Sequence, residues 1–320
     1  MNAAQLTRRE VLVSGALGMA GLLSSRAPAR AGPASAPAAA AGALTLGGDL
    51  TVRRLGFGAM RITGRGSWGE PPDAAEARHV LRRALELGVN FIDTADAYGP
   101  DVSERLIAEA LHPYPRGLVI ATKGGLIRPG ASSWVPDGRP EHLREACEAS
   151  LKRLKLERID VYQLHRIDPK VPLEESMGEL ARLKEQGKIR HVGVSNFGTD
   201  ELSRARRIVP VVSVQNRYNI ADRSSEDVLS VCARDGLAFI PWAPLARGSA
   251  DTLESGAARA AVEAVAQAHG ISVLQVAIAW LLAKSPAMLP IPGTSSVAHL
   301  EQNVAAAAVK LSAVELGALG

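Results

Sequence analysis

The 320-residue chain is poor in aromatic residues and in cysteine. It has four each of Phe, Tyr and Trp, and its two thiols are Cys147 and Cys232. Two cysteines so far apart in the sequence fit no metal-binding spacing, and no metal site is expected. Both lie in stretches with a helical pattern, which favours inert buried thiols, although the sequence alone leaves a disulfide between them open.

The sequence also lacks long apolar runs and biased composition. Hydrophobic residues make up 47% and charged residues 22% of the chain, shares that exclude a disordered, collagen-like or coiled-coil protein. The apolar run at residues 11–23 would extend about 20 Å as a helix, less than the roughly 30 Å of a bilayer core. No stable membrane span is therefore expected, and the length suits one large α/β domain or two smaller ones.

The first 31 residues are predicted to be an export leader. The twin arginine Arg8-Arg9 stands just before the apolar run, and Ala29-Arg30-Ala31 has small residues where a signal peptidase cleaves. This arrangement is typical of a twin-arginine (Tat) signal peptide, so the Tat export machinery is an expected partner and the expected location is periplasmic or extracellular. The alternative is a disordered basic tail on a cytoplasmic protein.

Little net charge remains once the leader is set aside. The formal charge of the whole chain is +4, and the leader supplies most of this excess through four arginines against one glutamate. The nearly neutral remainder gives no reason to expect a nucleic acid or an anionic membrane surface as a partner.

The mature chain begins with a segment of simple composition. Residues 32–43 are Ala, Gly, Pro and Ser, which predicts a flexible linker without core potential. Residues 44–55 are then predicted to form a β-hairpin that turns at Gly47-Gly48-Asp49.

From residue 55 onward, short apolar strands alternate with amphipathic helices. This alternation predicts a parallel sheet covered by helices, and eight units in one domain spanning residues 44–320 favour a (β/α)8 TIM barrel over an open sheet. The expected strands are residues 55–60, 90–95, 118–123, 161–165, 191–196, 211–215, 237–242 and 288–293. The expected helices include residues 73–87, 102–111, 140–154, 173–186, 224–234 and 272–283.

One segment imitates a dinucleotide-binding fingerprint. Residues 64–69 satisfy G-x-G-x-x-G, and Asp93 follows at the end of a predicted strand. In the true fingerprint the first Gly ends a strand and the third lies inside the next helix. Here Pro71-Pro72 separates Gly69 from that helix, so the segment is predicted to be a loop.

Four polar side chains follow the predicted second, third and fourth strands. Asp93 and Tyr98 come after the second strand, Lys123 ends the third, and His165 ends the fourth. Catalytic groups of such barrels lie at the C-terminal ends of strands, so these four are expected to converge at one rim. Each has an ordinary structural explanation when taken singly, but the combination favours a catalytic set.

This set suits the addition of a proton to an oxygen atom. Tyrosine is a poor acid with an ordinary pKa of about 10, and an ammonium group beside it lowers that pKa. Lys123 can supply the charge, Asp93 can hold it protonated, and Tyr98 becomes a usable proton donor. His165 can hydrogen-bond a carbonyl oxygen nearby. A hydride must then come from a bound cofactor, because no side chain donates one.

Asp93, Tyr98, Lys123 and His165 resemble the catalytic tetrad of the aldo-keto reductases, which are NADP(H)-dependent (β/α)8 barrels. The resemblance runs from about residue 44 to near the C-terminus. It implies an oxidoreductase that reduces an aldehyde or ketone to an alcohol, with NADPH as cofactor, a small carbonyl compound as substrate and Tyr98 as proton donor.

Further motifs of this family imply a cofactor site. Residues 193–197 resemble the fifth-strand motif, in which Ser195 and Asn196, together with Gln215, would bind the nicotinamide carboxamide. Trp242 stands where family members usually stack a Tyr on the nicotinamide ring, and an indole can stack as well. The resemblance extends the cofactor contacts to Pro244, Leu245, Arg247 and Gly248.

Residues 291–303 resemble the family's loop and helix that bind the adenosine 2′-phosphate and the adenine. Many members have Lys and then Arg where this chain has Gly293 and His299, and Gln302 replaces the usual Glu. Hydroxyls and backbone N–H groups at a helix N-terminus can hold a phosphate, although imidazole binds it less well than a bidentate arginine. The resemblance still favours NADPH over NADH, through Gly293, Thr294, Ser295, His299, Gln302 and Asn303.

Within the family, the chain is most similar in look to the bacterial pyridoxal reductases (pyridoxine 4-dehydrogenases), which makes pyridoxal a candidate substrate. Trp68 and Trp134 lie in predicted loops after barrel strands, where they either line an aromatic-aldehyde pocket or pack loop against barrel. A second function is a redox-sensing NADPH-binding module with little turnover, as in the potassium-channel β subunits of the family. The intact tetrad favours the enzyme.

Overall fold

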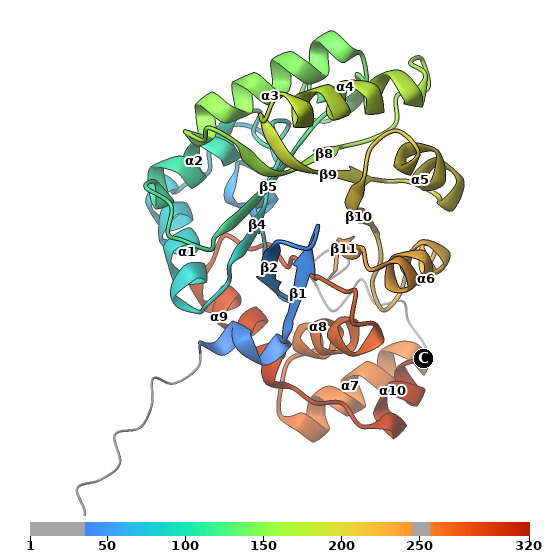
Figure 1. Cartoon of the computed structure of the whole chain (residues 1–320). Helices are drawn as coiled ribbons and strands as arrows, with labels where there is room; N and C mark the ends of the chain where they lie inside the picture. The colour runs from blue at the N-terminus through green and yellow to red at the C-terminus, as the bar shows by residue number, and fades with distance from the viewer. Residues whose placement is uncertain (1–35, 245–256) are drawn as a thin grey trace, which may run out of the picture. The chain divides into compact units, whose positions relative to one another are not determined.

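Seven parallel strands form the central sheet of the protein, which is described here by a computed structural model of residues 36–244 and 257–320 (Figure 1). Neighbouring strands follow one another in the order β11-β10-β9-β8-β5-β4-β3. The predicted leader and residues 32–35 of the predicted linker lie outside the described residues. The strands are β3 (Phe57–Gly58), β4 (Phe91–Asp93), β5 (Val119–Gly124), β8 (Ile159–Leu164), β9 (Ile189–Ser195), β10 (Val211–Arg217) and β11 (Ala238–Trp242).

The eighth predicted strand closes the ring without becoming a regular strand. The Leu289 N–H donates to the Phe239 carbonyl in β11 at 2.9 Å, and the Gly56 N–H, just before β3, donates to the Pro290 carbonyl at 2.9 Å. Pro290 and Pro292 have no N–H to donate, so residues 288–293 cannot complete a ladder. The strand predicted there is corrected to an extended segment, and the predicted (β/α)8 barrel is confirmed.

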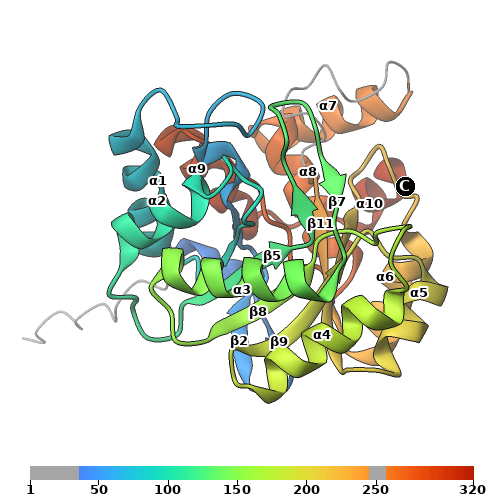
Figure 2. The ribbon, with the colours of Figure 1, turned by 90° about the horizontal axis from the view of Figure 1, so that it is seen from above.

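Helices cover the outside of the barrel (Figures 1 and 2). Those predicted at residues 73–87, 102–111, 140–154, 173–186, 224–234 and 272–283 are all present, within two residues at each end. The sequence analysis did not predict α5, α7 or α10. The helices are α1 (Ala74–Glu86), α2 (Val102–Leu111), α3 (Pro140–Leu154), α4 (Leu173–Glu185), α5 (Thr199–Arg206), α6 (Glu226–Asp235), α7 (Ala257–His269), α8 (Val273–Lys284), α9 (Val297–Ala305) and α10 (Ala313–Leu319).

Local sequence signals fix the ends of several helices. The Asp73 carboxylate accepts hydrogen bonds from the backbone N–H groups of Ala75 and Glu76, which caps α1, and Gly88 follows that helix with φ 89°.

Among the described residues, no single helix has both the length and the apolar character of a membrane span. Residues 259–269 of α7 pass that test only together with α8, across a bend of 98°.

A β-hairpin closes the N-terminal end of the barrel. Strands β1 (Ala43–Leu46) and β2 (Leu50–Arg53) pair antiparallel around the predicted turn at residues 47–49. Leu46, Leu50 and Val52 are buried in the same cluster as strand residues that face the barrel interior. Asp49 pairs with Arg190 at 2.8 Å at the start of β9. In Figure 2 this hairpin lies opposite a second one, β6 (Leu126–Ile127) with β7 (Val135–Pro136).

The expectation that residues 32–43 lack core potential is wrong for residues 37–41. Pro37–Ala41 form the 3₁₀ helix η1, in which Ala38 and Ala41 are buried. The Ala38 N–H donates to the Leu87 carbonyl at 3.0 Å, and η1 packs against a second 3₁₀ helix, η4 (Ala306–Ala308). Alanine side chains are small enough to let these short helices approach closely, which composition alone did not indicate.

The G-x-G-x-x-G segment is a loop, as predicted. The Gly64 N–H donates to the Gly69 carbonyl at 2.9 Å, and Gly66 and Gly69 have φ values of 72° and 67°. Because several residues separate this loop from α1, it does not present a helix N-terminus to a phosphate.

Both cysteines are free and fully buried, in α3 and α6. Burial raises the pKa of each thiol, Cys147 and Cys232, to about 12. The prediction of inert buried thiols is confirmed, since the thiolate is the reactive form.

Because only one face of β1 packs into the barrel, mutations on its two faces should change the free energy of unfolding by different amounts. Leu46→Ala should lower the free energy of unfolding by about 2–5 kcal/mol, because it leaves a cavity in the interior. Thr45→Ala, on the exposed face of the same strand, is the matched control and should change it by less than about 0.5 kcal/mol. Urea denaturation measures both values, and equal losses would contradict the packing.

Candidate active site

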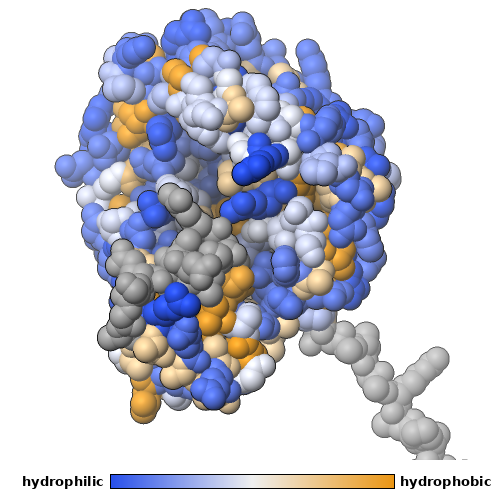
Figure 3. Space-filling model, turned by 180° about the vertical axis from the view of Figure 1, so that it is seen from behind, coloured by the Kyte–Doolittle hydropathy of each residue, from blue (hydrophilic) through white to orange (hydrophobic). Residues whose placement is uncertain are grey.

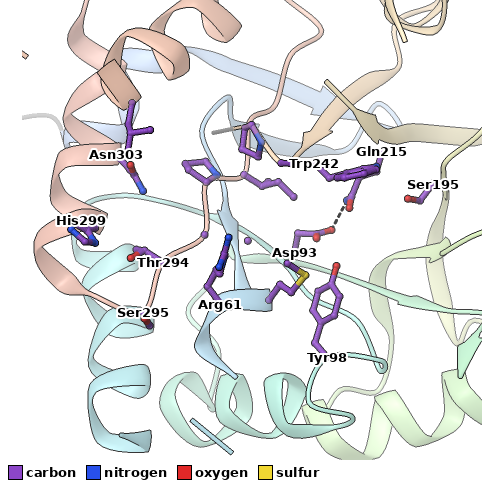
Figure 4. A pocket seen from close by; sticks show the side chains of 18 of the residues that line it. Arg61, Asp93, Tyr98, Ser195, Gln215, Trp242, Thr294, Ser295, His299 and Asn303 are labelled. Atoms are coloured by element: carbon purple, nitrogen blue, oxygen red, sulfur yellow. Dashed lines mark hydrogen bonds between the residues drawn. The ribbon is translucent and has the colours of Figure 1, made fainter. Parts of the chain in front are cut away.

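A cavity of about 580 Å³ opens at the C-terminal ends of the strands. Figure 3 views the corresponding face of the molecule, which is hollowed near its centre and bordered by strongly hydrophilic side chains. The close-up in Figure 4 shows residues from β4, β9, β10, β11 and α9 pointing into the cavity.

A buried ion pair lies at the floor of the cavity. The Lys123 Nζ is 2.6 Å from the Asp93 Oδ1, and the two residues are 0% and 1% exposed. The same Nζ donates to the Thr94 carbonyl at 2.8 Å and to the Tyr98 Oη at 3.3 Å. An ammonium group has three hydrogens, and these three acceptors use all of them. Because Tyr98 is an acceptor toward Lys123, its own O–H hydrogen is free to donate into the cavity.

The second oxygen of Asp93 fixes two amide side chains. Its Oδ2 accepts hydrogen bonds from the Nε2 atoms of Gln163 at 2.9 Å and Gln215 at 2.8 Å. An ionised carboxylate only accepts, so each glutamine must turn its NH₂ group toward Asp93. The Gln215 Oε1 is then left as an acceptor beside the cavity, where an amide donor of a ligand can reach it.

In Tyr98 and in Lys123, burial shifts the pKa one way and the charge of a neighbouring group shifts it the other way. Burial raises the pKa of Tyr98 above its ordinary value, and the attraction of Lys123 only partly offsets this. The expectation of a lowered Tyr98 pKa is therefore wrong for the resting site. Burial disfavours the charged form of Lys123, but Asp93 and then Tyr98 outweigh it and raise the Lys123 pKa. The phenol and the ammonium are thus both fully protonated at neutral pH.

His165 forms the wall beside Tyr98 as a neutral imidazole. Burial, followed by the repulsion of Lys123, holds the pKa of His165 well below its ordinary value. Its ring meets the Tyr98 ring edge-on at 5.9 Å between centroids. Its Nδ1 is buried and has no hydrogen-bond partner in the part of the chain that the structure describes. An orphaned polar atom of this kind is typical of a catalytic or ligand-binding group.

Asn196 and Trp242 form a second polar contact across the cavity from Tyr98. The Trp242 Nε1 donates to the Asn196 Oδ1 at 3.0 Å. The Asn196 NH₂ group donates to the Ser195 Oγ at 3.0 Å and to the His165 carbonyl at 3.1 Å. Asn196 has φ 62°, a conformation that Asn tolerates better than most residues. The indole is thus held at the cavity wall by its only polar atom.

The far end of the cavity is built by the loop before α9 and by α9 itself (Figure 4). The Thr294 Oγ1 accepts from the Ser296 N–H at 3.1 Å, and the Glu76 Oε1 accepts from the Val297 N–H at 3.3 Å. A carboxylate therefore already occupies one donor of the α9 N-terminus. The lining residues here are Gly293, Thr294, Ser295, His299, Gln302 and Asn303.

The cavity brings together most of the predicted site residues. Lys123 lies beneath the surface of the cavity, and the predicted contacts Leu245, Arg247 and Gly248 lie outside the described residues. The sequence analysis missed Gln163, which its place two residues before His165 in the same predicted strand could have signalled. It also missed several lining residues, which come mainly from the segment after β3 and from loops: Gly58, Met60, Arg61, Leu126, Arg166, Ser272 and Leu274.

The two tryptophans of the rim have different positions. Trp134 lines the cavity and meets the rings of Tyr98 and His165 edge-on, at 6.4 Å in each case. Trp68 lies outside the cavity lining and packs on Arg128, whose guanidinium also stacks on Trp134 at 3.6 Å.

Arg128 binds three rim segments through their backbones. Its guanidinium donates to the carbonyl oxygens of Gly66, Ser67, Ala97 and Ala131. Within the described ranges no carboxylate pairs with it, and no group of three or more His, Cys, Asp or Glu side chains could hold a metal ion.

A buried carboxyl group adjoins the ion pair. Asp96 is 8% exposed, its N–H donates to the Lys123 carbonyl at 3.3 Å, and its Oδ1 has no hydrogen-bond partner among residues 36–244 and 257–320. Burial, followed by the repulsion of Glu104, raises the pKa of Asp96 well above its ordinary value.

Comparisons with known proteins agree with this geometry. Residues 54–319 match the model of the Aldo/keto reductase family. The chain is 51% identical over 265 residues to an uncharacterized oxidoreductase of Schizosaccharomyces pombe, covering 83% of this chain and 85% of that one. It is 43% identical over 278 residues to pyridoxine 4-dehydrogenase of Escherichia coli, covering 85% and 95%.

Solved structures extend the likeness to the fold. An aldo/keto reductase from Klebsiella pneumoniae in complex with NADP and acetate superposes with a TM-score of 0.74 at 28% identity. The match covers 87% of this chain and 93% of that chain.

The raised pKa of Asp96 predicts how its replacement changes stability with pH. Above the ordinary carboxyl pKa of about 3.9, the unfolded chain ionises Asp96 while the folded chain keeps its proton, so wild-type stability falls as pH rises. Asp96→Asn keeps the shape without titrating. Its advantage in free energy of unfolding over wild type should therefore grow as pH rises above about 4, until pH passes the raised pKa of Asp96 in the folded chain. Urea denaturation at a series of pH values measures this. A constant difference would contradict the buried proton.

Proposed function

The chain belongs to the aldo/keto reductase family, and from this premise we propose that it is an NADPH-dependent reductase that converts an aldehyde or ketone into an alcohol. The observation that carries the proposal is the Tyr98 O–H, which the three hydrogen bonds of Lys123 leave free to donate into the cavity.

The lining of the cavity fits a nicotinamide dinucleotide. The Ser195 hydroxyl can donate to a carboxamide, and the side-chain oxygens of Asn196 and Gln215 can accept from it. Trp242 offers a flat face for the ring. Hydroxyls of Thr294 and Ser295, with His299 and Asn303, would hold the adenosine end. NADPH, when bound, supplies the hydride.

Tyr98 would supply the proton. Its raised pKa keeps the phenol protonated at rest, as a proton donor requires. When the proton leaves, the negative charge that develops on the Tyr98 oxygen lies 3.3 Å from the Lys123 ammonium, which stabilises it without any rearrangement. Asp93 keeps that ammonium charged and in place, and neutral His165 can hold the substrate oxygen beside the phenol.

The walls near Tyr98 favour a flat, largely apolar carbonyl compound. Trp134, Met60 and Leu126 line the cavity, and Trp134 stands edge-on to both Tyr98 and His165. An aromatic aldehyde fits such walls, because its ring can pack on the indole. The relative named pyridoxine 4-dehydrogenase makes pyridoxal the first substrate to test.

We also propose that the protein is exported by the Tat route. The sequence of residues 1–31 supports this, and a pathway that carries folded proteins suits a chain that loads its cofactor before export.

Removing the Tyr98 hydroxyl should separate chemistry from cofactor binding. Tyr98→Phe should lower kcat for NADPH oxidation with pyridoxal by at least about 100-fold, because the proton donor is lost. The dissociation constant for NADPH should change little. Tyr114→Phe is the matched control, since the Tyr114 hydroxyl bonds the Leu154 carbonyl away from the cavity.

Each other outcome has a distinct meaning. Loss of NADPH binding in Tyr98→Phe would show that the site is misplaced. Wild-type protein that retains NADPH tightly and shows little turnover with a panel of aldehydes would favour the redox-sensing module instead.

The export proposal predicts a requirement for the arginine pair. Replacing Arg8 and Arg9 by lysine keeps the charge but removes the pair that the Tat machinery reads. The variant should accumulate unprocessed inside the cell, whereas wild type should be found outside the cytoplasm. Immunoblots of cell fractions would measure both. Equal distribution of the two proteins would rule out this route.

A further inference from the structure

Arg61 is a cation in the middle of the cavity, and none of the residues that the structure describes pairs with it. It follows β3, lines the cavity and forms no ion pair or hydrogen bond with any described residue. Figure 4 shows it between Asp93 and Tyr98 on one side and Thr294 and His299 on the other. Of the described lining residues, only Arg61 and Arg166 are arginines, and none is a lysine.

The backbone geometry explains why the opposite loop carries no cation of its own. A Cβ on Gly293 would overlap the Gly58 carbonyl oxygen, and a Cβ on Gly58 would lie 2.6 Å from the Ile291 carbonyl oxygen. The first and last segments of the barrel thus approach too closely for a side chain at either position. A lysine at position 293 is excluded in this chain.

Arg61 lies against the place that a side chain at position 293 would need. Its Cγ lies 3.5 Å from the point where the Gly293 Cβ would stand. The Arg61 stem therefore packs over the glycine, and its guanidinium extends into the groove from β3 rather than from the loop. The nearest ligand groups on the loop side, the Thr294 and Ser295 hydroxyls, are neutral.

We propose that Arg61 binds the diphosphate of the bound dinucleotide. This rests on the proposed function, which places the nicotinamide between Tyr98 and Trp242 and the adenosine near His299 and Asn303. The diphosphate joins these two ends and carries two negative charges, and Arg61 lies midway between them. A guanidinium matches phosphate oxygens with two parallel N–H donors, so it suits this place better than an ammonium group.

Arg116 has a different position. It lies in the turn before β5, is exposed and is not among the residues that line the cavity. It therefore provides a control of equal charge and similar exposure that lies away from the expected diphosphate.

The test is the affinity of the full chain for two nucleotides, measured by isothermal titration calorimetry. Arg61→Met should weaken NADPH and NADH by the same factor, about 10- to 100-fold, because both carry the diphosphate. Arg61→Lys should recover part of the loss, since it restores the charge but not the fork of donors. Arg116→Met should leave both dissociation constants within about twofold of wild type.

Every other result overturns the assignment in a recognisable way. Loss of affinity for NADPH alone would place Arg61 at the 2′-phosphate, and unchanged affinities would show that it makes no nucleotide contact. Equal losses in Arg61→Met and Arg116→Met would indicate a general field effect. Wild-type protein that binds neither nucleotide would overturn the proposed function itself. If wild type binds both nucleotides and Arg61→Met binds them equally well, only the assignment of Arg61 is overturned.

Discussion

The Asp93 carboxylate is the group on which the rest of the site depends. One oxygen holds the Lys123 ammonium, and the other accepts from two glutamines. Because an ionised carboxylate cannot donate, it dictates the orientation of everything bonded to it: Lys123 donates on toward Tyr98, and Gln215 turns its oxygen to the cavity. One buried charge thereby determines which atoms donate and which accept hydrogen bonds, both beside Tyr98 and at the expected carboxamide site. All these partners of Asp93 come from the protein itself, so the orientation of the site is set by its own side chains.

The closure of the barrel is the second constraint, and it shapes the cofactor groove. Two prolines keep residues 288–293 from completing a sheet, and a glycine on each side lets that segment approach β3. Where backbones approach this closely, side chains must come from neighbouring positions. Arg61 and the residues before α9 therefore face each other across the groove, whereas the hairpin fills the other end of the barrel with leucine and valine.

Much of this architecture follows from the sequence. Alternating apolar strands and amphipathic helices give the barrel, and Asp93, Tyr98, Lys123 and His165 stand at strand ends where the fold brings them together. The sign of the Tyr98 pKa shift did not follow, because it depends on how far burial outweighs the ammonium, and a sequence carries no solvent exposure. Arg61 was missed because its position depends on Gly293, a residue far away in the chain. Alanine-rich residues 37–41 were taken for a linker because alanine is common in both linkers and tightly packed helices.

Arg128 holds the rim together through backbone atoms, whereas the side chains of the rim determine which molecules it can recognise. Its bonds go to carbonyl oxygens of three segments, and every residue type provides a carbonyl oxygen. Side chains around the mouth can therefore be exchanged during evolution without loosening the entrance, provided that Arg128 and its two indole neighbours remain. Substitutions of rim side chains would thus change what the mouth recognises, while the tetrad below stays as it is.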